Sequence, residues 1–101
     1  MFNNTQQGAN MPIKILRMPS VEDASGYANS TLYLRISEGL WTPPVSLGAR
    51  AVGWPSSEVA ALNAARIAGK TADEIRALVK RLVAARVSAL AVLEAGSGHE
   101  S

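Results

Sequence analysis

Side chains that usually carry catalysis or hold metal ions are scarce in this sequence. The chain has no cysteine and a single histidine, His99, which lies in a polar C-terminal stretch. It has no paired histidine and carboxylate, and no glycine-rich phosphate loop with its lysine. We therefore expect no enzyme activity, no metal, no cofactor and no small-molecule ligand. What remains is the chemistry of arginine, tyrosine and hydroxyl groups, which can contact nucleic-acid phosphates and base edges.

The surroundings of Arg50 predict a hairpin with a basic tip. Gly48-Ala49-Arg50 lies between two apolar segments, Val45–Leu47 and Ala51–Trp54, as expected for two strands joined by a short loop. Pro43-Pro44 cannot join a helix and forces an extended approach to the first strand. An arginine at such a tip can reach a minor groove or the phosphate backbone, although it can also be an ordinary surface charge.

Two short helices are predicted ahead of this hairpin. Ser20 is a candidate N-cap with Asp23 three residues on, and Gly26 ends that helix. A second helix begins around residues 29–31 and is ended by Gly39 in the left-handed conformation. Two short helices joined by a tight turn with glycine are typical of helix-turn-helix proteins. The hairpin that follows completes the order of parts in a winged helix.

Two further helices are expected, from Pro55 to Gly69 and from Thr71 to about Ala95. Thr71-Ala72-Asp73-Glu74 has the pattern of a capping box. The helix expected from Thr71 to about Ala95 is about 36 Å long at 1.5 Å per residue, which is longer than the small core beneath it can cover. Its distal part either pairs with another chain or frays. We expect self-association, with a closed dimer as the default and a head-to-tail filament as the alternative; the residues expected to mediate it are Leu82, Val83, Val87, Leu90 and Leu93.

The basic residues of this last helix lie largely off the apolar stripe. They form either a solvated face or a DNA contact, and the sequence leaves both open; they are Arg76, Lys80, Arg81 and Arg86.

The expected fold is mostly α with a small β-hairpin wing, that is, a winged helix-turn-helix plus a long C-terminal helix. The 101 residues, 48% of them hydrophobic, allow one domain with one modest core. We expect a disordered tail at 1–12, the winged helix at 13–70, the C-terminal helix at 71–95 and a second tail at 96–101. The predicted core residues are Val21, Leu32, Ile36, Val52, Trp54, Val59 and Leu62. Trp41 is expected either in the core or packed at the base of the wing.

Hydrophobicity and charge limit where the protein can be located and what it can bind. The longest apolar run, Val87–Leu93 with Ser88 as its one polar residue, is far too short for a membrane span, and the N-terminus has no signal-peptide pattern. We expect a cytoplasmic, nucleoid-associated protein. The formal net charge of +2 permits a nucleic-acid partner without requiring one.

Many matched positions at fixed spacing make the chain similar to the AlpA-type prophage regulators and excisionases, over about residues 13–86. The matching runs include Ile15-Leu16-Arg17-Met18-Pro19, Ser30-Thr31-Leu32-Tyr33-Leu34-Arg35-Ile36, Thr42-Pro43-Pro44-Val45 and Arg50-Ala51-Val52-Gly53-Trp54-Pro55. The resemblance implies a winged helix like that of MerR proteins and excisionases. It also implies a protein of a prophage or integrative element that activates integrase or excision genes, or directs recombination.

By this resemblance the DNA-binding residues are Asn29, Ser30, Thr31, Tyr33, Arg35, Ser46 and Arg50. Asn29 is expected to cap the helix rather than read a base, whereas Ser30 and Thr31 can cap it, bind phosphate or do both. Tyr33 can pack half-buried or donate to a phosphate. Arg35 matches an exposed position of the recognition helix, although a solvated role is its alternative.

Two departures from the family weaken the expected DNA contacts. The chain has Ala28-Asn29 where a Ser-Arg pair is common, and Ser46 where a basic residue is usual. Between Ile13 and Pro55 four basic residues face three acidic ones, a net of +1. We therefore expect double-stranded DNA as the partner, bound cooperatively by a homo-oligomer on repeats, with a tyrosine integrase as a possible second partner. The alternative is a protein-interaction module, such as an antagonist of another regulator, that has lost strong DNA binding.

Overall fold

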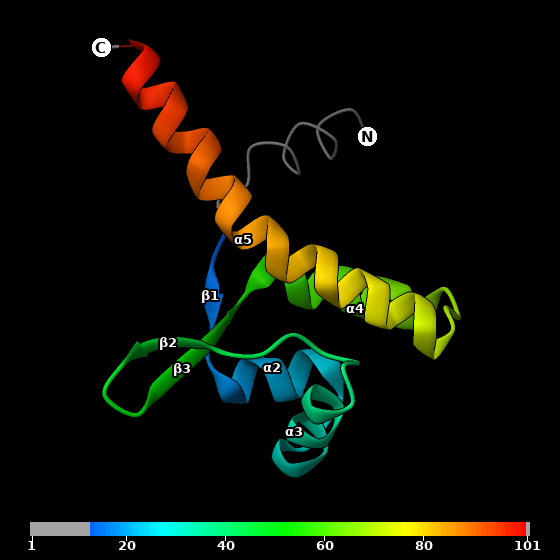
Figure 1. Ribbon diagram of the computed structural model, residues 1–101. Helices are drawn as coiled ribbons and strands as arrows, with labels where there is room; N and C mark the ends of the chain where they lie inside the picture. Colours follow the sequence, from blue (N-terminus) through cyan, green and yellow to red (C-terminus); the bar gives the residue numbers. More distant parts are fainter. Residues whose placement is uncertain (1–12, 101) are drawn as a thin grey trace, which may run out of the picture.

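The computed structural model describes the backbone of residues 13–100 and the side chains of residues 13–88 and of Leu90. Its elements, in chain order, are β1 (Ile15–Leu16), α2 (Met18–Ser25), α3 (Asn29–Ser37), β2 (Val45–Gly48), β3 (Ala51–Pro55), α4 (Ser56–Ile67) and α5 (Ala72–Glu100) (Figure 1). This order confirms the expected winged helix-turn-helix with a long C-terminal helix. The tail expected at 1–12 lies outside the described residues.

The helix pair α2 and α3 forms where it was predicted, and α3 begins at Asn29 as expected, but α2 begins earlier than predicted. α2 begins at Met18, with Arg17 as N-cap and proline in its first turn, so Ser20 lies inside the helix and is not its cap. Proline fits there because the first-turn N–H groups have no partner within the helix. Gly26 and Gly39 both have φ of 78°, the left-handed conformation expected where these helices end.

The sheet has three antiparallel strands in the order β1-β3-β2, where the sequence predicted only the β2–β3 hairpin. β1 pairs Ile15 with Pro55 and Leu16 with Trp54. The sheet needs a glycine at position 53, because an added β-carbon would lie 2.6 Å from Ile15 Cγ2 and 3.0 Å from the Leu16 carbonyl oxygen.

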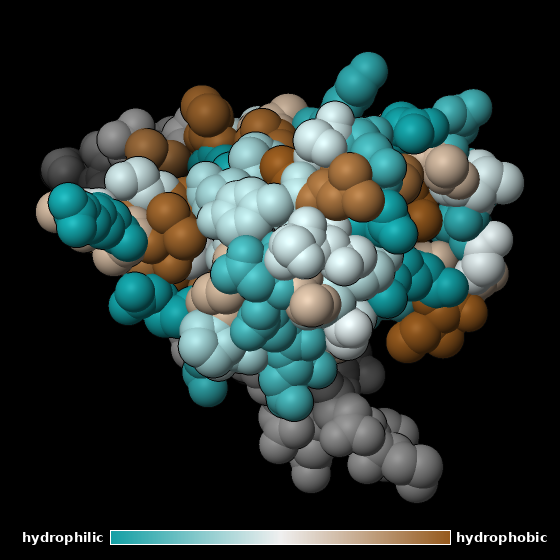
Figure 2. All heavy atoms as spheres, turned by 90° about the horizontal axis from the view of Figure 1, so that it is seen from below, coloured by the Kyte–Doolittle hydropathy of each residue, from teal (hydrophilic) through white to brown (hydrophobic). Residues whose placement is uncertain are grey.

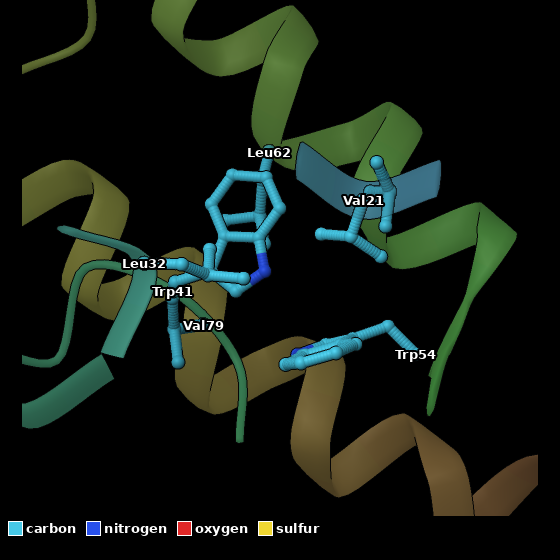
Figure 3. Packing of buried hydrophobic residues seen from close by; sticks show 7 residues of the cluster. Val21, Leu32, Trp41, Trp54, Leu62 and Val79 are labelled. Atoms are coloured by element: carbon cyan, nitrogen blue, oxygen red, sulfur yellow. The ribbon is translucent and has the colours of Figure 1, made fainter. Parts of the chain in front are cut away.

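The core lies between the helix pair, the sheet and the two C-terminal helices (Figure 3). Trp54 is fully buried, and its indole N–H donates to the Thr42 carbonyl at 2.8 Å, which satisfies its polar atom. Most predicted core residues are confirmed as buried, while Ile36 and Val52 are partly buried at its edge. The buried cluster consists of Val21, Leu32, Trp41, Trp54, Val59, Leu62 and Val79.

The two C-terminal helices also follow the prediction closely. α4 begins at Ser56, since Pro55 belongs to β3. The capping box ahead of α5 is confirmed: the Thr71 N–H donates to Glu74 Oε1 at 2.9 Å, and the Glu74 N–H donates to Thr71 Oγ1 at 3.2 Å. α5 runs to Glu100, so residues 96–100, expected to form a loose tail, are helical. No helix among the described residues has both the length and the hydrophobicity to cross a membrane.

Candidate nucleic-acid interface

α3 and the β2–β3 hairpin lie on the same side of the molecule, away from the C-terminal end of α5 (Figure 1). Leu32 and Ile36 face the core, so the outward face of α3 is formed by residues at intervening positions. Ser30, Tyr33 and Leu34 are exposed there. Figure 2 shows this side from below: hydrophilic and neutral residues cover most of it, and the hydrophobic ones gather in separate patches.

The polar residues at the start of α3 do not cap it. The N-cap is Ala28, and no side chain makes a capping hydrogen bond, so the cap role expected for Asn29 is wrong. Neither Ser30 nor Thr31 has a side-chain hydrogen bond within the described part of the chain, and Asn29 and Ser30 are exposed. The first turn of α3 therefore presents free N–H groups and polar side chains together, an arrangement suited to phosphate.

Arg35 lies at the opposite end of α3 and has partners within the protein. Its Nη1 atom lies 2.9 Å from Glu38 Oε1, and its guanidinium lies 5.6 Å from the centre of the Tyr27 ring. The hydrogen bond to Glu38 raises the pKa of Arg35 above its usual value. Arg35 is thus a permanent cation, but a DNA contact by it has to compete with Glu38 or share the guanidinium with it.

The wing presents Arg50 at its tip. Arg50 is exposed and has φ of 61°, a left-handed conformation that is unfavourable for a residue with a β-carbon. No ion pair involves Arg50 in the described part of the chain. Ser46 is exposed on β2, opposite Val52 in the ladder. The hairpin therefore offers one exposed charge without an ion pair in the described part of the chain, and one hydroxyl group.

The prediction from sequence missed one exposed residue of α3, Leu34. Half of its surface is accessible (50%), on the face shared with Tyr33. An apolar side chain on a helix that enters a major groove can contact the thymine methyl group. The signal was present in the sequence, because Leu32 and Ile36 face inward and a residue midway between them must face outward.

Behind α3, Tyr27 joins the helix pair to α4. Its ring stands edge-on to Trp41 with centroids 5.9 Å apart, and the Arg66 guanidinium lies 4.2 Å from its centre. Arg66 also donates to the Ser25 carbonyl at 2.7 Å. The turn between α2 and α3 is thereby held by a side chain of α4.

Two arginines of α5, expected on a basic face, are instead bound to the protein itself. Arg86 makes a two-pronged ion pair with the buried carboxylate of Glu58, at 2.7 Å for each prong, and donates to the Pro43 carbonyl at 2.8 Å. Arg76 donates to the Glu38 carbonyl at 2.9 Å. Only Lys80 and Arg81 remain of this face as exposed cations without a partner in the described part of the chain.

The residues expected to mediate self-association fall into three groups. Leu82 and Val83 are partly buried and pack against the protein's own core. Val87 and Leu90 are exposed, at 73% and 56%. The side chain of Leu93 lies outside the described residues. Among the side chains that the structure describes, the exposed candidates are therefore Val87 and Leu90.

Comparison with known proteins bears on the identity of this chain. The sequence profile described as prophage CP4-57 regulatory protein (AlpA) matches residues 14–66, which include α2, α3 and the wing. The chain belongs to the AlpA family. It is also 46% identical over 57 residues to an uncharacterized protein, ORF88, of Enterobacteria phage P4. This match covers 56% of the chain and 65% of the phage protein, so the chain spans just under two thirds of that relative. No solved structure matches the chain.

AlpA is a family of regulatory proteins and not of enzymes. The matched range ends at Arg66, so the family profile covers the winged helix and stops before α5. The side chains of α3 and the wing lie inside the AlpA match, while the arginines of α5 lie outside it.

Proposed function

We propose that this AlpA-family chain is a sequence-specific DNA-binding regulator of a mobile element, with α3 and the wing as its interface to double-stranded DNA. The observation that carries this proposal is that α3 and the β2–β3 hairpin lie on one side of the molecule (Figure 1), with Ser30 and Tyr33 exposed on α3 and Arg50 exposed at the hairpin tip. A major groove admits an α-helix, and the wing can then contact the backbone or the adjacent minor groove. Membership in a family of regulators supports the same role.

Within this role, we propose that the protein acts either as an excisionase or as a transcriptional activator of integrase or excision genes. Both activities use one DNA-binding domain, and a tyrosine integrase is the partner expected for excision. An excision assay with the cognate integrase, run beside a promoter-reporter assay, separates the two. Excision stimulated without a change in transcription supports the first role, and the reverse supports the second.

The interface is tested by Arg35→Ala and Arg50→Ala, alone and together. The wild-type protein first selects a site from a pool of randomised duplexes, and affinity for that site is measured by fluorescence anisotropy. Each substitution is expected to cost about 1–3 kcal/mol of binding free energy if the arginine makes a bidentate base contact. If it makes a phosphate contact, the salt slope falls by about one unit. Arg81→Ala removes an exposed charge of α5 and is the matched control. A folded double variant with unchanged affinity would overturn the proposed interface.

We further propose that binding is cooperative and that the distal half of α5 supplies the contact between copies. The local net charge of +1 in residues 13–55 gives a single copy few phosphate contacts, and contacts between neighbours on DNA raise the overall affinity. Val87 and Leu90 are exposed apolar side chains in the distal half of α5. The C-terminal end of this helix extends away from the other elements (Figure 1). Burying such a side chain contributes about 1.5–3 kcal/mol.

Val87→Glu with Leu90→Glu tests the contact between copies, with Ser88→Glu as a control at an exposed position of the same helix segment. The pair is expected to abolish self-association in sedimentation analysis and to remove cooperativity on tandem sites. A truncation for the same purpose should follow Ser88, because a cut before Arg86 also removes the ion pair with Glu58. Strictly monomeric wild-type protein, both free and on DNA, contradicts the cooperative scheme.

One observation favours a second candidate function, a protein-interaction module. The charge of Arg35 is paired with Glu38, so few unpaired cations face outward from α3. In this case neither selected nor random duplexes bind at physiological salt, and Val87→Glu with Leu90→Glu disrupts a heteromeric complex instead.

A further inference from the structure

The connection between α3 and the wing spans residues 38–44, and α5 binds both of its ends. At the α3 end, the Arg76 Nε group donates to the Glu38 carbonyl at 2.9 Å. At the wing end, an Nη atom of Arg86 donates to the Pro43 carbonyl at 2.8 Å. Main-chain carbonyls in a connection have no ladder partner, and a guanidinium is well suited to satisfy them because it donates several N–H groups in a fixed plane.

Each of the two arginines is itself held in place. Arg86 is fixed by both oxygens of Glu58, whose side chain is only 4% exposed at the start of α4. Arg76 is paired with Asp73 one turn earlier, at 3.2 Å, and its aliphatic part lies against Gly39, where a β-carbon would sit 3.6 Å from Arg76 Cγ. Arg76 and Arg86 are separated along α5 by about 15 Å, at 1.5 Å per residue. A continuous helix with two fixed donors sets the spacing between the two ends of the connection.

We infer that α5 sets the position of the wing relative to α3, with Arg76 and Arg86 as its two positioning residues for DNA recognition. This inference rests on the proposed function, in which α3 and the wing contact one DNA duplex at the same time. A recognition helix and a wing that are linked only by a flexible segment lose affinity, because ordering the segment costs free energy on binding. The side chains of Arg76 and Arg86 lower that cost in residues 38–44 without touching DNA. They act beside the pairing of β1 with β3 and the hydrogen bond that Arg17 Nε donates to the Val52 carbonyl at 3.1 Å.

If these arginines contacted phosphate directly, one variant would change the affinity for DNA in the opposite direction. Glu58→Gln removes the charge that holds Arg86. If Arg86 contacted phosphate, this change would free it and tighten DNA binding. If Arg86 positions the wing, the same change weakens binding. Arg86→Lys keeps the positive charge but loses the two-pronged geometry, and is expected to weaken binding as well.

The main experiment measures affinity for the selected duplex with variants that retain the wild-type circular dichroism spectrum. Arg76→Met, Arg86→Lys and Glu58→Gln are each expected to weaken binding by about tenfold, which is within the coupling range for residues that share partners. Lys80→Met and Arg81→Met remove exposed charges from the same helix and are expected to change affinity less than about twofold. In the Arg86→Lys background, Arg50→Ala is expected to add less than about twofold, because a displaced wing no longer brings Arg50 to the duplex.

A second measurement does not depend on DNA binding. Amide hydrogen exchange of the free protein is expected to quicken in the wing and in residues 38–44 of Arg76→Met and Arg86→Lys, while the Trp54–Leu62 region keeps its protection. Unchanged exchange there, affinity losses no larger than those of Lys80→Met and Arg81→Met, or tighter binding by Glu58→Gln overturns the inference. If exchange quickens as expected but Arg35→Ala and Arg50→Ala leave DNA binding unchanged, the positioning of the wing by α5 stands and the proposed function fails.

Discussion

Three arginines of α4 and α5 and the arginines of α3 and the wing are one residue type in two settings. Arg66, Arg76 and Arg86 each donate to a main-chain carbonyl at a helix end or in a connection, at 2.7, 2.9 and 2.8 Å. Arg50 has no ion pair in the described part of the chain, and Arg35 is paired only with a residue three positions away. The first group, here called the framework arginines, holds connections in place, while the second leaves charge available at the surface. The two groups should differ most clearly in how far removal of the side chain lowers the free energy of unfolding and how far it lowers the affinity for DNA.

The widest difference is expected at Arg86. Arg86→Met leaves the Glu58 carboxylate buried without a partner, and should lower the free energy of unfolding by about 3 kcal/mol, because an unpaired buried charge is strongly destabilising. Urea denaturation measures the loss, with Arg50→Met expected to stay within about 0.5 kcal/mol of wild type. Combined Glu58→Met and Arg86→Met should recover most of the stability. Equal effects of Arg86→Met and Arg50→Met would erase the distinction between the two groups.

A smaller loss is expected at Arg66. Arg66→Met removes both the hydrogen bond to the Ser25 carbonyl and the stacking on Tyr27, and together these should cost about 2 kcal/mol of unfolding free energy. Thermal denaturation of Arg66→Met and Tyr27→Leu, alone and together, measures the coupling between the two side chains. Strictly additive losses would show that the stacking on Tyr27 contributes nothing.

At Arg50 the effect of substitution on stability should have the opposite sign. Arg50→Gly relieves the left-handed backbone at φ of 61°, so stability is expected to rise by about 0.5 kcal/mol while DNA affinity falls. Arg50→Ala keeps the β-carbon and is the matched control, with the loss of affinity but no gain in stability. A loss of stability in the glycine variant would mean that the tip is held by interactions of the arginine side chain.

The smallest effect is expected from acid at the start of α5. A hydrogen bond from the Thr71 amide lowers the pKa of Glu74, so the carboxylate stabilises the fold above its usual pKa of about 4.3. This stabilisation is lost as the pH falls through the lowered folded value. Chemical denaturation between about pH 5 and 3 should therefore show a steeper loss for wild type than for Glu74→Gln. Parallel curves would mean that the carboxylate charge plays no part in the cap.

How well the sequence predicted a structural feature depends on how far apart in the sequence its interacting residues lie. The capping box of Thr71 and Glu74 and the left-handed Gly39 were predictable, because their partners lie within one turn of helix. The cap assigned to Ser20 was wrong because a proline in the first turn lets α2 begin three residues earlier, with Arg17 as its N-cap. β1 was missed because two residues carry no readable alternation.

The framework arginines were out of reach for a different reason. The partners of Arg86 lie 28 and 43 positions away in the sequence, and nothing local distinguishes this arginine from the exposed Arg81. Periodicity placed Arg86 off the apolar stripe, which is correct for an exposed cation but not for one that reaches a buried carboxylate. Only the fold shows which cations of α5 are used internally. The polar face of α3, by contrast, was predicted from the match to the family, and its residue identities remain to be tested on DNA.

The fixed interval between Arg76 and Arg86 also limits how the length of α5 can change. A residue inserted into a helix turns everything beyond it by about 100° and moves it 1.5 Å along the axis. Inserted between the two arginines, it swings Arg86 away from Glu58 and Pro43 while Arg76 stays on Glu38. The same insertion after Ser88 leaves both anchors in place and turns only the distal segment. Insertions and deletions in α5 are therefore tolerated beyond Arg86 and excluded between the two anchors, so the reach of the distal helix can change without disturbing the winged helix.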